Sequence, residues 1–176
     1  TPISGMPILM AHQSGRVIVC NLDEKPGYSG VENPLYEDQR AVLLFGDAKA
    51  SLERLLAKVS SAEASLAQVG SGAAPAGADP FAEAVKSLTE AKSVIVIPGF
   101  GMALAQAQFA LVDLAGRLEA AGKRVRYAIH PLAGRMPGHM HVLLAEAQVP
   151  SGQLYDIKEI NDDFPATDVT VVVGAC

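Results

Sequence analysis

The stretch VIVIPGFGMALAQAQFAL, residues 94–111, decides the fold that the sequence predicts. Its first half is an apolar, β-branched run that ends at Pro98, and its second half has the spacing of a helix. Gly99 and Gly101 stand between the two halves, so the stretch predicts a strand, a glycine turn and a helix. Such a turn is typical of a dinucleotide site, because glycine lets the backbone approach a pyrophosphate closely. The third glycine of the G-x-G-x-x-G pattern is replaced by Leu104.

Similar apolar runs recur along the chain and alternate with helical patterns. The runs that predict buried parallel strands are residues 16–21, 41–45, 93–98, 124–131, 154–160 and 168–175. Helices are predicted after Asp47, after the N-cap pair Asp79 and Pro80, from Met102 to a C-terminal Gly122, and over residues 141–147. This alternation predicts a Rossmann-like, doubly wound six-stranded parallel sheet with helices on both faces.

The composition fits one soluble α/β domain. The 176 residues are 49% hydrophobic, and the net charge of −5 with scattered basic residues argues against a nucleic-acid surface. No apolar run reaches the roughly 20 residues that a membrane span needs, and the first residues lack the charged start of a signal peptide. Cys20 and Cys176 each follow an apolar run, so we expect buried thiols and no disulfide.

A segment rich in Ala, Gly, Ser and Pro interrupts the pattern. We interpret residues 60–79 as a linker, with residues 70–78 as its flexible part. Residues 1–59 and 80–176 each have too few strands to form a domain alone, so we expect them to share one sheet.

The strand after the glycine turn ends in AIHPLAGRMPGH, residues 128–139, without the acidic residue that usually binds the ribose of NAD. Arg135 follows in a loop that contains glycine, where it can face a phosphate. The alternative is that the glycines at 99, 101, 134 and 138 only make tight turns.

The histidines and acidic residues give no metal pattern. His130, His139 and His141 match no standard zinc spacing, and we interpret them as loop and helix-surface side chains. The acidic run that includes Asp162 and Asp163 is typical of a solvated surface.

Several blocks carry a resemblance to a known family. They are PGFGMALAQAQ, AIHPLAGRMPGHMHVLLAEAQVP, EINDDF, TDVTVVVGA, PISGMPIL, GYSGVENPLY and LFGDAK. Together they resemble domain III of the proton-translocating nicotinamide nucleotide transhydrogenase, its NADP(H)-binding component. The resemblance implies that NADP(H) binds in a reversed orientation and that a residue larger than glycine is tolerated at Leu104.

The resemblance also implies cofactor contacts, with a lid at Gly27 and Tyr28 and the adenosine end at Asp47. The implied contacts are Gly99, Phe100 (where Tyr is usual), Gly101, Met102, Ala103, Leu132, Ala133, Gly134, Arg135, Met136, Pro137, Gly174, Ala175, Cys176, Gly5, Met6, Asn21, Leu22, Asp23, Lys25, Pro26, Gly27, Tyr28, Asp47 and Ala48. No side chain is implied as an acid or base, because hydride passes directly between nicotinamides.

The implied partners are the NAD(H)-binding domain I and the membrane-spanning domain II of the transhydrogenase. The resemblance thus implies an enzyme component on the cytoplasmic face of the inner membrane, peripheral and coupled to proton translocation. The alternative function is a soluble NAD(P)(H)-binding sensor or regulatory module without hydride transfer. A third alternative is a domain of this fold with a vestigial site.

The order of the two pieces departs from the family. There, the piece similar to residues 80–176 comes first, and a loop with the Asp that couples nucleotide state to proton movement leads to PISGMP. We expect either a circular permutant joined through residues 70–78 or a numbering that places the two pieces out of chain order, and the sequence leaves both open.

The loop that corresponds to the family's 2′-phosphate site, residues 21–25, also departs from the family pattern. Where the family commonly has Lys-Arg-Ser, this chain has Asn21, Leu22 and Asp23, followed by Glu24 and Lys25. Losing two cations and gaining acids weakens a site for a dianionic 2′-phosphate. The resemblance favours NADP(H), and NAD(H) is the competing cofactor.

Overall fold

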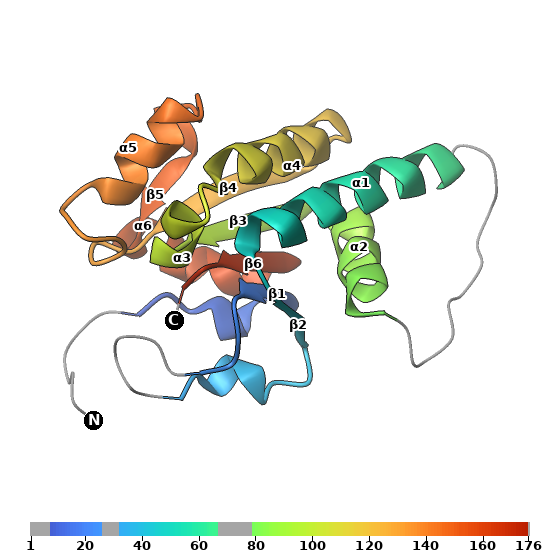
Figure 1. Cartoon of the computed structure of the whole chain (residues 1–176), viewed down its shortest axis with the longest axis horizontal. Coiled ribbons are helices and arrows are strands. Elements are labelled where there is room, and N and C mark those ends of the chain that lie inside the picture. The colour runs from blue at the N-terminus through green and yellow to red at the C-terminus, as the bar shows by residue number, and fades with distance from the viewer. Residues whose placement is uncertain (1–7, 26–31, 67–78, 176) are drawn as a thin grey trace.

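The computed structural model describes residues 8–25, 32–66 and 79–175, with the side chains of residues 63–66 excepted. It contains one six-stranded sheet in which every pairing is parallel, in the order β2-β1-β6-β3-β4-β5. The strands are β1 (Arg16–Asn21), β2 (Ala41–Phe45), β3 (Ser93–Pro98), β4 (Arg124–Ile129), β5 (Leu154–Asp156) and β6 (Val169–Val173). The predicted Rossmann-like α/β fold is confirmed (Figure 1).

Helices connect the strands on both sides of the sheet. The α-helices are α1 (Ala48–Leu66), α2 (Pro80–Glu90), α3 (Phe100–Leu104), α4 (Gln108–Ala120), α5 (His139–Glu146) and α6 (Ile157–Ile160). The 3-10 helices are η1 (Ala11–Gln13), η2 (Pro34–Tyr36), η3 (Ser151–Gln153) and η4 (Asn161–Ala166). None of the helices in these described ranges is long and apolar enough to cross a membrane.

The strand order matches a known arrangement when the strands are counted from β3. Counted as β3, β4, β5, β6, β1 and β2, the strands lie in the order 3-2-1-4-5-6, which is the order of dinucleotide-binding sheets. In the chain itself β2 precedes β3 and is followed by α1 and α2. In the numbering of this sequence the strand order is therefore a circular permutation of that order, and its topological switch point lies between β3 and β6.

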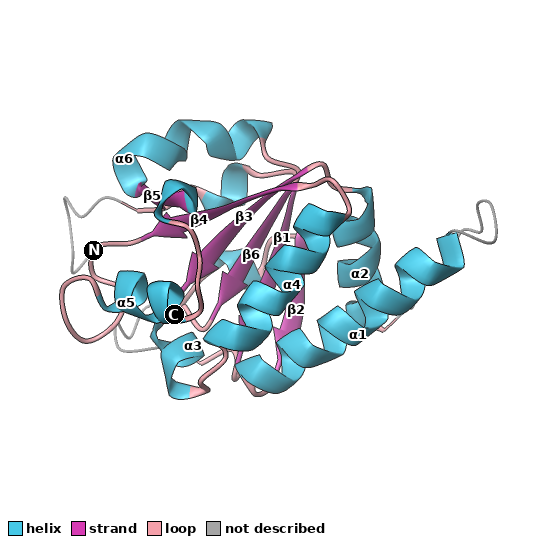
Figure 2. Cartoon of the chain, turned by 90° about the horizontal axis from the view of Figure 1, so that it is seen from above, coloured by secondary structure: helices cyan, strands magenta, loops and turns pink. Residues whose placement is uncertain are grey.

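Two apolar cores lie on opposite faces of the sheet. The larger packs α1, α2, α4 and α5 against side chains such as Val96 and Val171, and the smaller packs η1, α6 and η4 against side chains such as Ile95 and Val172. Figure 2 shows the long helices α1 and α4 lying across the strands on the larger-core face. Both faces are thus covered, which explains why the strands are nearly continuous apolar runs.

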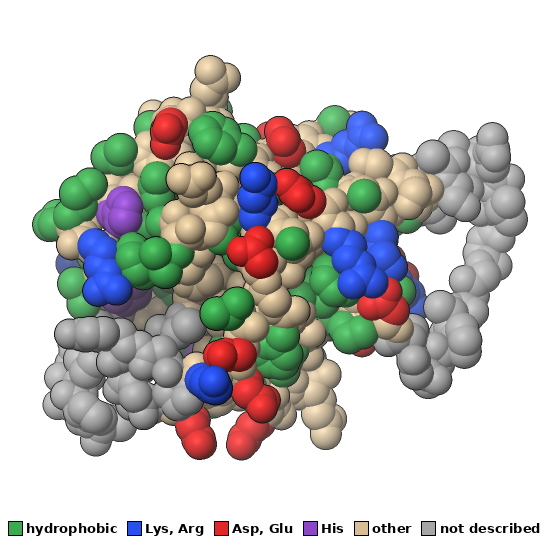
Figure 3. Space-filling view, in the orientation of Figure 1, with side chains coloured by type: hydrophobic (Ala, Val, Ile, Leu, Met, Phe, Trp, Pro, Cys, Tyr) green, Lys and Arg blue, Asp and Glu red, His purple; other side chains and the backbone are tan. Residues whose placement is uncertain are grey.

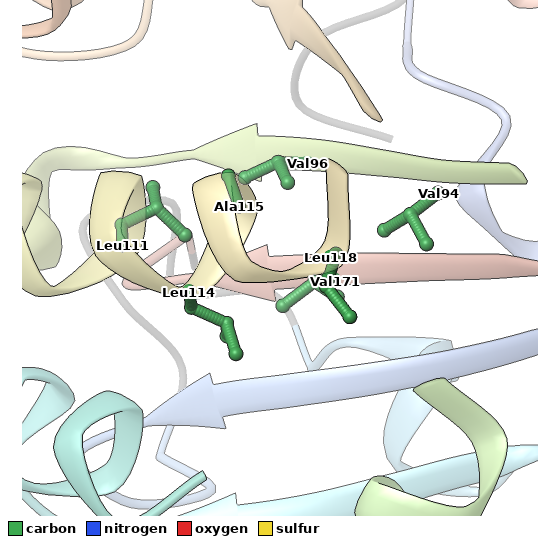
Figure 4. Close-up of a pocket in the computed structure, with 7 residues that line it drawn as sticks. All are labelled: Val94, Val96, Leu111, Leu114, Ala115, Leu118 and Val171. Carbon is green, nitrogen blue, oxygen red and sulfur yellow. The ribbon is translucent and has the colours of Figure 1, made fainter. Parts of the chain in front are cut away.

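A small void lies inside the larger core between α4 and the strands β3 and β6. Its volume is about 10 Å³, and its lining is entirely apolar, with Leu111, Leu114 and Leu118 facing Val94 and Val171 (Figure 4). A space of this size without polar partners stays empty of water. It is a packing defect of the core and offers no ligand site.

Several predicted boundaries are confirmed. Asp79 caps α2 by accepting a hydrogen bond from the Phe81 N–H at 3.1 Å, with Pro80 at the first helical position. Gly122 follows the cap of α4 with φ of +81°, which favours glycine. Cys20 is buried, and burial raises the pKa of its thiol to about 12. Cys176 and residues 70–78 lie outside the described residues.

Three predicted elements differ from the structure by a break or by more than two residues at one end. The helix expected from Met102 is broken into α3 and α4, because Gln106 adopts a left-handed φ of +50° between them. The strand expected over 154–160 ends at Asp156, whose carboxylate and Glu159 form a capping box that starts α6. Residues 60–66 of the expected linker are helical, since α1 continues to Leu66.

Candidate functional site

The glycine turn after β3 packs directly against the chain that leaves β6. The Gly101 N–H donates to the Gly174 carbonyl at 2.8 Å, and the Gly99 N–H donates to the Val173 carbonyl at 2.8 Å. A Cβ on Gly101 would lie 2.8 Å from the Gly174 Cα, and one on Gly174 would lie 2.6 Å from the Gly101 Cα. The two glycines of the turn are therefore needed for backbone packing at the switch point, independently of any ligand.

The loop after β4 folds over the same turn. The Arg135 guanidinium carbon lies 4.3 Å from the centroid of the Phe100 ring, a cation–π contact. The His139 ring lies 6.1 Å from the Phe100 ring, and its Nδ1 accepts a hydrogen bond from the Arg135 N–H at 3.1 Å. A cation, an aromatic face and the glycine turn thus meet at the carboxyl end of β3.

Asn21 closes the other side of the switch point. Its amide is 1% exposed, and its Nδ2 donates to the Tyr36 hydroxyl at 2.7 Å and to the Ala175 carbonyl at 2.9 Å. Its Oδ1 is buried and has no hydrogen-bond partner among the residues that the structure describes. The Asn21 side chain therefore connects the end of β1 to the segments after β6 and before β2, and its donors are not available to a phosphate.

The next residues of this loop are exposed and carry opposite charges. Leu22 is 74% exposed, and the Lys25 ammonium lies 3.7 Å from the Asp23 carboxylate. Asp23 also accepts a hydrogen bond from the Lys25 N–H at 3.0 Å. At the end of β2, Asp47 Oδ1 accepts from the Ala50 N–H at 2.9 Å at the start of α1.

A pocket of about 200 Å³ lies beside the loop after β4. Its lining is Ile129, His130, Pro131, Ala133, Pro137, Gly138, His139, Met140, His141 and Asp156. Although several imidazoles are near one another, the described residues contain no group of three or more His, Cys, Asp or Glu that could hold a metal ion. Asp156 is engaged in capping α6.

Exposed hydrophobic side chains surround this corner of the molecule. Leu132 is 63% exposed, Met136 is 54% exposed and Val142 is 58% exposed. Figure 3 shows hydrophobic side chains gathered over α5 and the loop before it, with cationic and His side chains among them. An amphipathic surface of this kind suits a ligand or partner with apolar and anionic parts.

The structure brings most of the implied cofactor contacts to one edge of the sheet. The described members at this edge are Gly99, Phe100, Gly101, Met102, Ala103, Leu132, Ala133, Gly134, Arg135, Met136, Pro137, Gly174, Ala175, Asn21, Leu22, Asp23, Lys25, Asp47 and Ala48. Within this set the side chains of Met102 and Ala48 are buried in the larger core, so they do not face the surface of this edge. Gly5, Met6, Pro26, Gly27, Tyr28 and Cys176 lie outside the described residues.

Two contributions to the site are absent from the sequence predictions. Tyr36 was not singled out, although an aromatic residue two positions after Asn-Pro indicates a short helical turn that can present a hydroxyl. The histidines were weighed only as metal ligands or surface residues, whereas His139 accepts a backbone hydrogen bond within the loop. No sequence signal marks this second role, because it depends on the His139 ring packing on Gly134, where a Cβ would lie 2.6 Å from the His139 Cβ.

The chain matches a family model described as the NAD(P) transhydrogenase beta subunit, over residues 1–58 and 60–176. It is similar to the NAD(P) transhydrogenase subunit beta of Rhodospirillum rubrum, with 54% identity over 88 residues, which are 50% of this chain and 19% of that protein. The same subunit of R. rubrum strain ATCC 11170 gives the same identity and coverage. The aligned part is thus less than a fifth of the length of these curated relatives.

The backbone contact at the switch point predicts unequal effects of two glycine substitutions. Gly101→Ala places a methyl group 2.8 Å from the Gly174 Cα, and we expect the free energy of unfolding to fall by about 2–3 kcal/mol through overpacking. Gly138→Ala meets nothing within 4 Å and has only the strain of φ +75°, about 1 kcal/mol. Urea unfolding of both variants measures the difference. Equal losses, or a larger loss in Gly138→Ala, would contradict the packing role of Gly101.

Proposed function

The chain belongs to the NAD(P) transhydrogenase beta subunit family, and from this premise we propose that it is the nucleotide-binding component of a transhydrogenase. In this proposal it binds NADP(H) at the carboxyl edge of the sheet and presents the nicotinamide to NAD(H) on a partner domain. Hydride then passes directly between the two nicotinamides.

The observation that carries the proposal is the arrangement at the switch point. Ligands of open α/β sheets bind outside the carboxyl ends of the strands at such a point, here between β3 and β6. The glycine turn, the Phe100 ring and the Arg135 guanidinium lie there together. A cation stacked on an aromatic face beside a glycine turn fits a pyrophosphate attached to flat rings.

The residues of this chain have binding roles in the proposal. Arg135 neutralises pyrophosphate charge, the exposed edge around Phe100 and Met136 receives the apolar parts of the dinucleotide, and Leu22 with Asp23 faces the adenosine ribose. The nicotinamide itself supplies the hydride-accepting or hydride-donating carbon. Because hydride transfer between two such rings moves no proton to the protein, the site needs no acid or base.

The partners follow from the same proposal. We infer that an NAD(H)-binding domain docks over the exposed hydrophobic side chains around Leu132 and that a membrane-spanning domain lies beside this one. In this assembly the domain works at the cytoplasmic face of the inner membrane and its nucleotide state is coupled to proton translocation. The alternative is a soluble NAD(P)(H) sensor, favoured by the Asp23–Lys25 pair, which leaves the loop after β1 without a free cation among its described residues.

Mixing the chain with a purified NAD(H)-binding domain of a transhydrogenase tests the proposal. We expect saturable NADP⁺ binding in calorimetry and hydride exchange between NADPH and an NAD⁺ analogue in the mixture. Arg135→Ala should weaken NADP⁺ binding about ten- to a hundredfold, because a charge-assisted contact to pyrophosphate contributes roughly 1.5–3 kcal/mol. Arg124→Ala, a matched change at the exposed amino end of β4, should leave the affinity unchanged.

The outcomes separate the alternatives. Nucleotide binding without hydride exchange supports the sensor, and the absence of binding to NADP⁺ and NAD⁺ contradicts both functions. Equal affinities of wild type and Arg135→Ala would remove Arg135 from the site.

The loop after β1 predicts how the cofactor preference responds to charge. Asp23→Ser deletes a negative charge and keeps a hydroxyl, so the ratio of NADP⁺ to NAD⁺ affinity should rise about three- to tenfold. Adding Leu22→Arg should raise the ratio further, because this exposed position has room for a guanidinium, and the gain should shrink at high salt. Asn21 is left unchanged, since its buried amide is already hydrogen-bonded. Calorimetric titrations with both nucleotides give the ratio.

Asp162→Ser is the matched control, because it makes the same charge change at an exposed position on η4, which packs on the smaller-core face of the sheet. An unchanged affinity ratio in the Asp23 variants, or an equal rise in the control, would show that the 2′-phosphate binds elsewhere.

A further inference from the structure

Two histidines hold the loop after β4 at its two ends. His130 stands directly after β4, and its Nδ1 accepts a hydrogen bond from the Leu132 N–H at 3.1 Å. His139 is the first residue of α5, and its Nδ1 accepts from the Arg135 N–H at 3.1 Å. Residues 131–138 are thus enclosed between two imidazoles that each bind the loop's own backbone.

The donors fix the protonation state of both rings. A backbone N–H can only donate, so each Nδ1 must carry a lone pair, and a neutral ring must then carry its proton on Nε2. An imidazolium has a proton on both nitrogens and cannot accept at Nδ1. The loop conformation in the structure therefore requires both rings to be neutral.

The contacts of His139 reach the candidate nucleotide site. Its ring packs on Gly134, whose φ of +99° and missing side chain make the approach possible. The amide that it accepts belongs to Arg135, whose guanidinium stacks on Phe100. The imidazole thus sets the backbone from which the cation projects.

We propose that His139, supported by His130, is a positioning residue that holds Arg135 over the glycine turn and does so only as a neutral imidazole. The expected effect on nucleotide affinity rests on the proposed function, because that function places Arg135 in the nucleotide site. Imidazole is the side chain that ordinarily changes charge between about pH 5 and 8. Nucleotide affinity therefore falls as the pH falls through this range.

The surroundings of the two rings contain few other charges. The charged or titratable groups that face them from the described parts of the pocket and the loop are Arg135, the exposed His141 and Asp156. Asp156 comes from the end of β5 and caps α6, while the ring of His141 makes no hydrogen bond within the described residues. His141 is therefore a matched control histidine on the same helix as His139.

The first test is made on the protein without nucleotide. Two-dimensional ¹H–¹⁵N spectra of the histidine rings should show protons on Nε2 and bare Nδ1 atoms for His130 and His139 at about pH 8. Lowering the pH to about 5.5 should shift the Leu132 and Arg135 amide signals together with the ring signals. A proton on Nδ1 at pH 8, or amides that do not follow the rings, would overturn the proposal.

The second test uses NADP⁺ and NAD⁺ titrations of four proteins at the two pH values. In the wild type the affinity should fall about three- to tenfold from pH 8 to 5.5, the effect of one lost hydrogen bond in the site. His139→Asn offers an amide oxygen near the position of Nδ1 and cannot titrate, so it should bind like the wild type at pH 8 and show a reduced pH dependence. His139→Leu lacks an acceptor and should bind weakly at both pH values.

The remaining protein, His141→Asn, should retain the wild-type pH dependence. The 2′-phosphate of NADP⁺ also titrates near pH 6, and comparing the variants with the wild type cancels its contribution. An unreduced pH dependence in His139→Asn, or its loss in His141→Asn, would overturn the role of His139. Absence of any nucleotide binding would instead refute the proposed function, while the ring spectra would still decide the state of the histidines.

Discussion

The contact between two stretches of backbone, the glycine turn after β3 and Gly174 after β6, is the constraint on which the site depends. Hydrogen bonds from the Gly99 and Gly101 amides bind the turn to the end of β6, and no side chain fits between the two segments. The close approach fixes where α3 starts and where the chain leaves β6. It also fixes the position of Ala175, whose carbonyl is held by Asn21. The edge at which a ligand would bind is therefore built from backbone before any functional side chain is added.

The candidate binding side chains lie around this backbone contact on loops that follow β1 and β4. Arg135 belongs to a loop that is exposed and held by two histidine acceptors, and Asp23 belongs to a loop that pairs its own charges. The backbone contact between the glycine turn and Gly174 involves no ionisable group. The charged and imidazole side chains around it are the groups on which pH and salt act. At the amino edge of the sheet a side chain makes the connection between β3 and β6. The Asp168 carboxylate accepts hydrogen bonds from the Lys92 and Ser93 amides, and these bonds lower the pKa of the Asp168 carboxyl.

The sequence predicted the fold well because its strands are short apolar runs whose boundaries are marked by Gly, Pro and Asp, as at Pro98 and Asp79. It failed at residues 154–160, where a capping box outweighs an apolar pattern. It also failed at Gln106, whose positive φ ends α3 in a local turn in which the Ala107 N–H donates to the Met102 carbonyl. The site residues were predicted largely through the resemblance to a family. Neither pattern nor resemblance revealed the direction of the side chains. The inward turn of Asn21 depends on Tyr36 and Ala175, which lie far from it in the sequence, and the hydrogen bond that His139 accepts from Arg135 depends on the conformation of the loop between them.

The central claim is that a nicotinamide nucleotide binds at the carboxyl edge of the sheet, around the switch point between β3 and β6. Backbone amide shifts recorded during a titration with NADP⁺ test it most directly. We expect the largest changes on Gly99 and Gly101, on residues 130–139, and on Gly174 and Ala175, while Lys92 and Asp168 at the opposite edge stay unchanged. Changes concentrated at that opposite edge, or no saturable change at all, would contradict it.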